Sequence, residues 1–268
     1  MSSAGISVSK EADGVAIVTF AGEPVNAMSL AFWKELLATV EGLDADPEVR
    51  AMVFHSGLKK SVFTAGLDIR ELYVPMTNHD RVYDFWATLS EALVKIYSTP
   101  KVTAAAIKGA CPAGGCVLSL CCDYRAITAD GSMGLNEVIL GIPVPHFWAQ
   151  VFASVTGQRQ AELLLQSGAM PKAPELLKLG MVDTVVEIVD DVLPAALKEV
   201  RKWLKYRDAS RAMTKMSLRG PLAERWHQGI EWESDMVWQS LNEPQAIESL
   251  TKVLKMLSGG SGAPAPKL

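Results

Sequence analysis

The chain has 268 residues, of which 49% are hydrophobic and 21% charged, a balance typical of a globular protein with one large core or a core plus a smaller helical part. Its formal charge of −4 lacks the basic excess that favours nucleic-acid binding, and no apolar run reaches the roughly 18 residues that a membrane span needs. We therefore expect neither a nucleic-acid partner nor a membrane segment.

The first part of the chain predicts two buried strands joined by a helix. VAIVTF (residues 15–20) and AMVFHS (residues 51–56) are short apolar runs bounded by turn residues, which is typical of strands. Between them, Ser29 can cap a helix whose apolar side chains fall on one face. These side chains are Phe32, Trp33, Leu36, Leu37 and Val40.

The middle of the chain continues this alternation. A long helix is expected over residues 81–97, before the apolar strand VTAAAI (residues 102–107), and a shorter helix over residues 114–120. Residues 125–129 and 181–186 are further predicted strands. Strands that alternate with helices predict an α/β fold.

After about Asp190 the pattern becomes entirely helical. Three apolar stripes at helical spacing run through residues 192–204, 222–241 and 247–257, and Pro244 suits the first turn of the last helix, with Asn242 as its cap. The predicted organisation is a core over residues 1–190, a helical region over 191–257 and a flexible Gly/Ser/Pro-rich tail over 258–268. The final Pro266-Lys267-Leu268 resembles a peroxisomal address signal, and a plain disordered end explains it equally well.

Four cysteines lie within twelve residues, at positions 111, 116, 121 and 122, without a Cys-x-x-Cys pair. On a helix, Cys116 and Cys121 would point about 140° apart, and the four histidines are scattered along the chain. We expect no metal site, and we interpret the cysteines as buried packing residues of a protein in a reducing compartment.

The segment KGACPAGGC (residues 108–116) contains two adjacent glycines between a strand and a helix. It matches neither phosphate-binding glycine pattern, and the chain has no GxSxG motif. The first N–H groups of the helix at Gly114 have no partner within the helix and lie at the positive end of its dipole. The pattern therefore suits a carbonyl oxygen that gains negative charge, although a simple tight turn would look the same.

A second loop has the same character. SVFTAGLDIREL (residues 61–72) follows a strand and carries Ala65-Gly66 before a helical pattern. One free N–H from each loop could hold a single oxygen, as in an oxyanion hole.

Four motifs in this order resemble the crotonase, or enoyl-CoA hydratase/isomerase, superfamily: PVNAMSL, FTAGLDI, GACPAGGCVLSLCCDYRAI and GLNEVILGI. The similarity runs from about Val15 to at least Asp183, and the ACPAGGC and GLNE versions are most similar to the isomerases of mitochondrial type. The resemblance implies a spiral of ββα units, a C-terminal helical trimerisation region, and assembly as homotrimers or dimers of trimers. It also implies an acyl-CoA thioester substrate, with coenzyme A as part of the substrate and no separate cofactor.

The resemblance places the oxyanion donors at the N–H groups of Ala65 and Gly114. It places substrate-binding residues in both loops and in and after the GLNE motif. These are Ala65, Gly66, Leu67, Asp68, Ile69, Gly114, Leu135, Phe147 and Trp148.

One carboxylate decides the expected reaction. Hydratases of the family use two glutamates, but here the first position is Val117 and only the second, Glu137, is acidic. A single carboxylate can move one proton between two carbons, so we expect Glu137 to take a proton from C2 of a 3-enoyl-CoA and return it to C4, giving trans-2-enoyl-CoA in fatty-acid β-oxidation. An apolar wall would raise its pKa. The candidates for that wall are Leu135, Ile139, Phe147 and Trp148.

Other interpretations stay open. Glu137 could be a surface or capping residue, Asp68 and Asp123 structural partners of backbone N–H groups or of Arg125, and His146, an apparent one-residue insertion, a helper in proton transfer. A hydratase, a catalytically silent acyl-CoA-binding protein or a thioester hydrolase would share these motifs. The resemblance suggests the mitochondrial matrix, and the tail suggests a peroxisome-like organelle.

Overall fold

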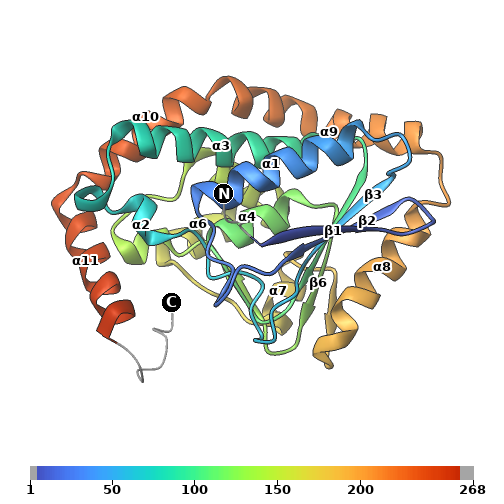
Figure 1. Ribbon diagram of the computed structural model, residues 1–268, viewed down its shortest axis with the longest axis horizontal. Coiled ribbons are helices and arrows are strands. Elements are labelled where there is room, and N and C mark those ends of the chain that lie inside the picture. The colour runs from blue at the N-terminus through green and yellow to red at the C-terminus, as the bar shows by residue number, and fades with distance from the viewer. Residues whose placement is uncertain (1–4, 260–268) are drawn as a thin grey trace.

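The computed structural model describes residues 5–259 and has a mixed α/β architecture (Figure 1). Its main sheet has the strand order β1-β2-β3-β4-β6-β8, with β1 antiparallel to β2 and the other neighbours parallel. The strands of this sheet are β1 (Ile6–Lys10), β2 (Val15–Phe20), β3 (Ala51–Ser56), β4 (Val102–Ile107), β6 (Tyr124–Thr128) and β8 (Thr184–Val186). The expectation of an α/β fold is confirmed.

Helices cover both faces of this sheet, which explains why its central strands are apolar without alternation. Ala105 and Ile107 of β4 belong to the large core under α1 (Leu30–Ala45) and α3 (His79–Ser98). Ala104 and Ala106 of the same strand face the opposite side, where they pack with α8 (Val192–Trp203). The small side chains of β4 let both helical layers approach the sheet closely.

The remaining short helices follow the loops that leave the sheet. They are α2 (Ile69–Leu72), η1 (Val74–Met76), α4 (Gly114–Cys121), η2 (Glu137–Leu140), α5 (His146–Thr156), α6 (Gln158–Ser167), α7 (Ala173–Lys178) and η3 (Val189–Asp191). The predicted cap of α1 is confirmed, because the Ser29 hydroxyl accepts a hydrogen bond from the N–H of Phe32.

The C-terminal region is helical as expected, but its second apolar stripe belongs to two helices. α9 (Asp208–Gln228) ends at Gly229 and α10 (Ile230–Leu241) starts directly after it; both pack along α3 at the top of Figure 1. Asn242 ends α10 and does not cap α11 (Pro244–Gly259), so that expectation is wrong. The division at residue 190 and the tail stay predictions, and residues 260–268, with Pro266-Lys267-Leu268, lie outside the described residues.

A two-stranded sheet that the sequence did not predict connects the two motifs of interest. β5 (Ala110–Pro112) pairs in parallel with β7 (Ser132–Gly134), and Pro112 lies opposite Gly134 in the register. The N–H of Ala113 also donates to the carbonyl of Gly134, with 2.9 Å between the two atoms. This pairing brings KGACPAGGC beside GLNE.

All four cysteines are fully buried free thiols, as expected of packing residues. Burial raises the pKa of the Cys111 and Cys122 thiols to about 12, so both stay protonated at neutral pH. Within residues 5–259 no group of three or more His, Cys, Asp or Glu side chains could hold a metal ion. No helix in that part of the chain is long and apolar enough to cross a membrane.

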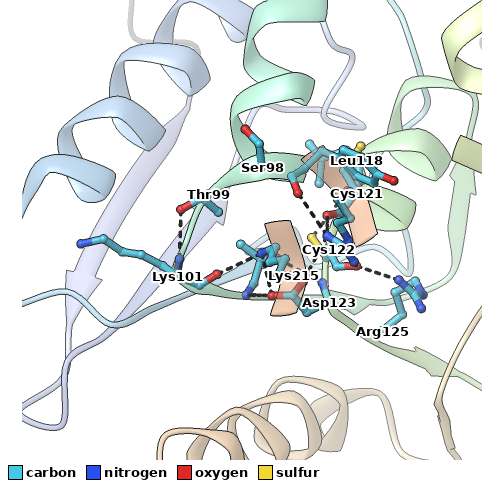
Figure 2. Close-up of polar contacts among 12 residues, drawn as sticks. Ser98, Thr99, Lys101, Leu118, Cys121, Cys122, Asp123, Arg125 and Lys215 are labelled. Carbon is cyan, nitrogen blue, oxygen red and sulfur yellow. Dashed lines mark hydrogen bonds and ion pairs between the residues drawn. The ribbon is translucent and has the colours of Figure 1, made fainter. Parts of the chain in front are cut away.

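A buried charge cluster joins the end of α4 to α9 (Figure 2). Asp123 accepts hydrogen bonds from the N–H of Thr103 and from the Lys215 ammonium, each at 2.9 Å, and its other oxygen lies 3.1 Å from the guanidinium of Arg219. Asp123 is therefore a structural residue, as one interpretation held. Its expected partner, Arg125, instead donates to the Cys122 carbonyl.

Candidate active site

A narrow apolar cavity opens where the two glycine-containing loops meet α3, α5 and α10. Ala65, Leu67 and Ala113 line it from the loops. Of the side chains that line it, only Asn136 has an amide and only Glu137 has a carboxylate. The cavity thus presents one ionisable group to an otherwise apolar ligand, which is the pattern of a binding site for a small molecule.

Glu137 is the first residue of η2, three residues after the end of β7. Its side chain is buried, and neither carboxylate oxygen has a hydrogen-bond partner among residues 5–259. Burial raises its pKa from 4.5 to about 7. A carboxylate that gives and takes a proton near neutral pH, with no protein group competing for its oxygens, is suited to general acid–base catalysis. This environment rules out a surface role.

Gly114 begins α4 directly behind the cavity lining. Its N–H belongs to the first turn and so has no acceptor within the helix. The preceding Ala113 has the unusual φ of 48°, which turns the chain into the helix. A Cβ on Gly114 would lie 2.7 Å from Cδ2 of Leu67, so a larger residue here would displace the Leu67 side chain that lines the cavity.

Ala65 lines the cavity, but its N–H is not free. It donates to the carbonyl of Val25, with 2.9 Å between nitrogen and oxygen. The expectation of an unpaired donor at Ala65 is therefore wrong for this structure. The reason is the preceding turn, where Asn26 donates from its side-chain amide to the Phe63 carbonyl and holds residues 22–26 against the second loop.

Some of the other residues of the FTAGLDI loop line the cavity, and the others pack against or cap neighbouring elements. Leu67 and Ile69 line the cavity as expected. Gly66, with φ of +85°, packs behind it against Pro112 and Ala113. Asp68 is not a lining residue; it caps α2 by accepting a hydrogen bond from the N–H of Arg70, in agreement with its structural interpretation.

Only one of the four residues expected to form the apolar wall lines the cavity, namely Trp148. Phe147 instead stacks on Trp226, and Leu135 is buried away from the cavity. Ile139 is 52% exposed, with its side chain directed toward Gly168. The expectation for these three residues is wrong. Around the short η2 and at the start of α5, side chains close together in the sequence point to different neighbours, so only some of them face the cavity.

The wall is completed by residues of two helices. Trp86 comes from α3, and Val237 and Leu241 come from α10. Val237 and Leu241 belong to the predicted apolar stripe over residues 222–241, but spacing within one helix carries no information about which distant loop that helix faces.

His146 does not reach the cavity. It is the exposed first residue of α5, where its ring pairs with Gln150 and packs edge-on against Trp232. The alternative interpretation of His146 as a helper in proton transfer is therefore wrong.

Comparison with family models, curated proteins and solved structures gives the same family each time. The family model described as Enoyl-CoA hydratase/isomerase matches residues 10–256. "Enoyl-CoA delta isomerase 1, mitochondrial" of Mus musculus is 37% identical over 252 residues, covering 93% of this chain and 86% of that protein. The Homo sapiens protein of the same name is 38% identical over 215 residues, covering 79% of this chain and 70% of that protein.

Solved structures agree. The crystal structure of human mitochondrial delta3-delta2-enoyl-CoA isomerase superimposes with a TM-score of 0.91 at 32% identity, covering 96% of this chain and 100% of that one. An enoyl-CoA hydratase from Bacillus halodurans superimposes with a TM-score of 0.84 at 20% identity, covering 92% and 99%, and shows the fold alone.

Proposed function

Because this chain belongs to the enoyl-CoA hydratase/isomerase family, we propose that it is an enoyl-CoA isomerase that converts a 3-enoyl-CoA to trans-2-enoyl-CoA in fatty-acid oxidation. The family and the crotonase fold that the motifs predicted are confirmed by these relatives. The observation that supports this reaction best is that Glu137 supplies the one carboxylate among the described residues that line the cavity, and that its oxygens have no partner in that part of the chain.

Glu137 acts first as base and then as acid. Its carboxylate removes a proton from C2 of the 3-enoyl thioester, the electrons shift toward the thioester oxygen, and the resulting acid returns the proton to C4. The pKa of about 7 suits both steps, because neither protonation state is strongly favoured at neutral pH.

The thioester oxygen gains charge during this reaction. The N–H of Gly114 and the positive end of α4 lie behind the cavity lining, and they stabilise the negative charge on the thioester oxygen. The N–H of Ala65 adds a second hydrogen bond when the Val25 carbonyl shares or releases it. Mobility of this turn would then accompany substrate binding.

The cavity favours isomerisation over hydration. Adding water requires a second acid or base to orient the water, and the position that supplies it in hydratases is the fully buried Val117. Among residues 5–259 no other carboxylate lines the cavity, whose surroundings are apolar. Bound water would find few partners there.

The same proposal covers partners and location. The substrate is an acyl-CoA thioester, with no further cofactor, and the protein assembles as a homotrimer or a dimer of trimers. The isomerase relatives are named as mitochondrial, which supports the mitochondrial matrix and gives no support to a peroxisomal tail signal.

The test is an assay of the purified chain with 3-enoyl-CoA and with 2-enoyl-CoA. We expect formation of trans-2-enoyl-CoA to exceed hydration, and Glu137→Gln to lower kcat by about a thousandfold or more. Glu91→Gln, an exposed carboxylate of α3, is the matched control and should keep full activity. Faster hydration, release of free thiol, or tight binding without turnover would each contradict the proposal and identify the hydratase, hydrolase or silent alternative.

A further inference from the structure

Another buried carboxylate, Glu233, lies behind the apolar wall of the cavity, where it contacts residues of α3 and α5. Glu233 of α10 is 1% exposed and accepts two hydrogen bonds from protein N–H groups. Its Oε2 accepts from the indole Nε1 of Trp86 at 3.1 Å, and its Oε1 accepts from the backbone N–H of Phe147 at 2.9 Å. Glu233 does not line the cavity and plays no part in the mechanism above.

The two donors belong to two different walls. Trp86 is a residue of α3, and Phe147 is the second residue of α5, directly before Trp148. Trp86 and Trp148 both line the cavity and stack on each other, with 5.4 Å between ring centroids and 26° between their planes. One carboxylate therefore holds both members of the stacked pair, Trp86 through its indole and Trp148 through the preceding peptide.

We propose that Glu233 is a positioning residue that fixes the Trp86–Trp148 pair and thereby limits the length of acyl chain that the cavity accepts. The inference rests on the proposed function, because it assigns acyl-chain selectivity to that same cavity. The helix that carries Glu233 also sends Val237 and Leu241, one and two turns further along, to the cavity lining. Fixing Glu233 thus fixes three sides of the apolar wall together.

A carboxylate suits this position better than an amide. Two N–H donors converge on it, and glutamine offers one acceptor oxygen while turning its NH₂ group toward the other donor. A buried N–H left facing a donor loses its hydrogen bond and its hydration, so Trp86 or the start of α5 would shift. The stacked indoles could then move apart and leave room for a longer acyl chain.

The experiment compares kcat/KM for 3-enoyl-CoA esters of six and twelve carbons. We expect Glu233→Gln to raise the ratio of the longer to the shorter ester by about fivefold or more. Trp86→Phe keeps an aromatic ring but removes the N–H, and should move the ratio the same way. The double variant should add little to either single variant, because both remove one interaction.

Asp123→Asn is the matched control, since it also neutralises a buried carboxylate with backbone and side-chain donors but contacts α9 and not the cavity. It should destabilise the protein and leave the ratio within about twofold of wild type. A Glu233→Gln ratio equal to that of this control would overturn the proposal. If Glu233→Gln does not fold, Glu233→Asp takes its place, because the shorter side chain keeps the charge but cannot reach both donors, and its ratio is judged against the same control.

A readout without turnover separates this proposal from the proposed function. The stacked indoles give a near-ultraviolet circular-dichroism couplet, assigned by its loss in Trp148→Phe, and saturated hexanoyl-CoA and dodecanoyl-CoA report binding by tryptophan fluorescence. We expect Glu233→Gln to weaken the couplet and to favour dodecanoyl-CoA. If wild type binds these esters but does not isomerise 3-enoyl-CoA, the proposed function fails, while the couplet and the binding preference still test the role of Glu233. An unchanged couplet and an unchanged binding preference in Glu233→Gln would refute its positioning role.

Discussion

Glu137 carries an electrostatic cost in the folded protein, because its charged form is buried without a partner among the described residues. Below pH 4.5 the carboxyl is protonated in both the folded and the unfolded chain, so folding is not penalised. As pH rises to about 7, the unfolded chain releases the proton and the folded chain keeps it. A difference between pKa values of 4.5 and about 7 corresponds to about 3 kcal/mol of lost stability above pH 7.

The first prediction at this scale is a pH-dependent gain of stability in Glu137→Gln. The variant cannot ionise, so its free energy of unfolding minus that of wild type should increase by about 3 kcal/mol between pH 4.5 and pH 8, which makes the variant relatively more stable at the higher pH. Calorimetry at both pH values checks this, with Glu91→Gln as the control that shows no such trend. A difference between variant and wild type that does not change with pH would show that Glu137 titrates as an exposed carboxyl does.

The residues of the site were predictable to different degrees. Glu137 and the helix start at Gly114 were found because each belongs to a short local motif, and the absence of a carboxylate at Val117 is readable directly. The pairing of the Ala65 N–H with Val25, and the hydrogen bond between Trp86 and Glu233, join segments 40 and 147 positions apart. No local pattern encodes such contacts, which depend on how the elements pack.

At the scale of elements, the long buried strands were the easiest to predict. β2, β3 and β4 have the predicted bounds, because six-residue segments that are mostly apolar and are bounded by turn residues leave little ambiguity. β5 and β7 are three residues each and are defined by their mutual pairing, so neither segment is distinctive alone. The sequence analysis missed the break between α9 and α10 because Gly229 ends one helix and starts the next while the apolar stripe continues across it.

The cluster in Figure 2 shows how a C-terminal helix is tied to the catalytic core. Arg219 of α9 donates to the carbonyl of Cys121 at the end of α4, where a cation also complements the helix dipole. Lys215, one turn earlier, donates to the Lys101 carbonyl and to Asp123. Both cations thus depend on Asp123 for a counter-charge, next to the helix that begins at Gly114.

The second prediction is that Asp123→Asn destabilises the protein by about 2 kcal/mol, because two partly buried cations lose their partner. The measurement is the midpoint of urea unfolding together with its slope. Asp84→Asn, which breaks an exposed ion pair with Lys34, should change stability by less than about 1 kcal/mol. Equal midpoints for the two variants would mean that the cluster contributes no more than a surface pair.

At the scale of the whole molecule, α9 has a face that this chain does not cover. Met213 is 72% exposed and Leu218 is 78% exposed, although α9 is packed along α3 on its other side. The two residues are five positions apart and so point about 140° apart, which means that the uncovered side of α9 is broad. Exposed large apolar side chains favour contact with another protein surface. The proposed homotrimer supplies such a surface from further copies of the same chain.

The third prediction follows from this face. Light scattering after size exclusion should give a mass of about 87 kDa for wild type, three chains of 29.0 kDa each, or twice that for a dimer of trimers. The double variant Met213→Glu, Leu218→Glu should shift the mass toward 29.0 kDa, because charges buried in an apolar interface oppose association. Ile188→Glu, at a residue 62% exposed before α8, should leave the assembly intact. A monomeric wild type, or equal effects of both changes, would remove α9 as the assembly surface without touching the chemistry at Glu137, since no residue of α9 lines the cavity.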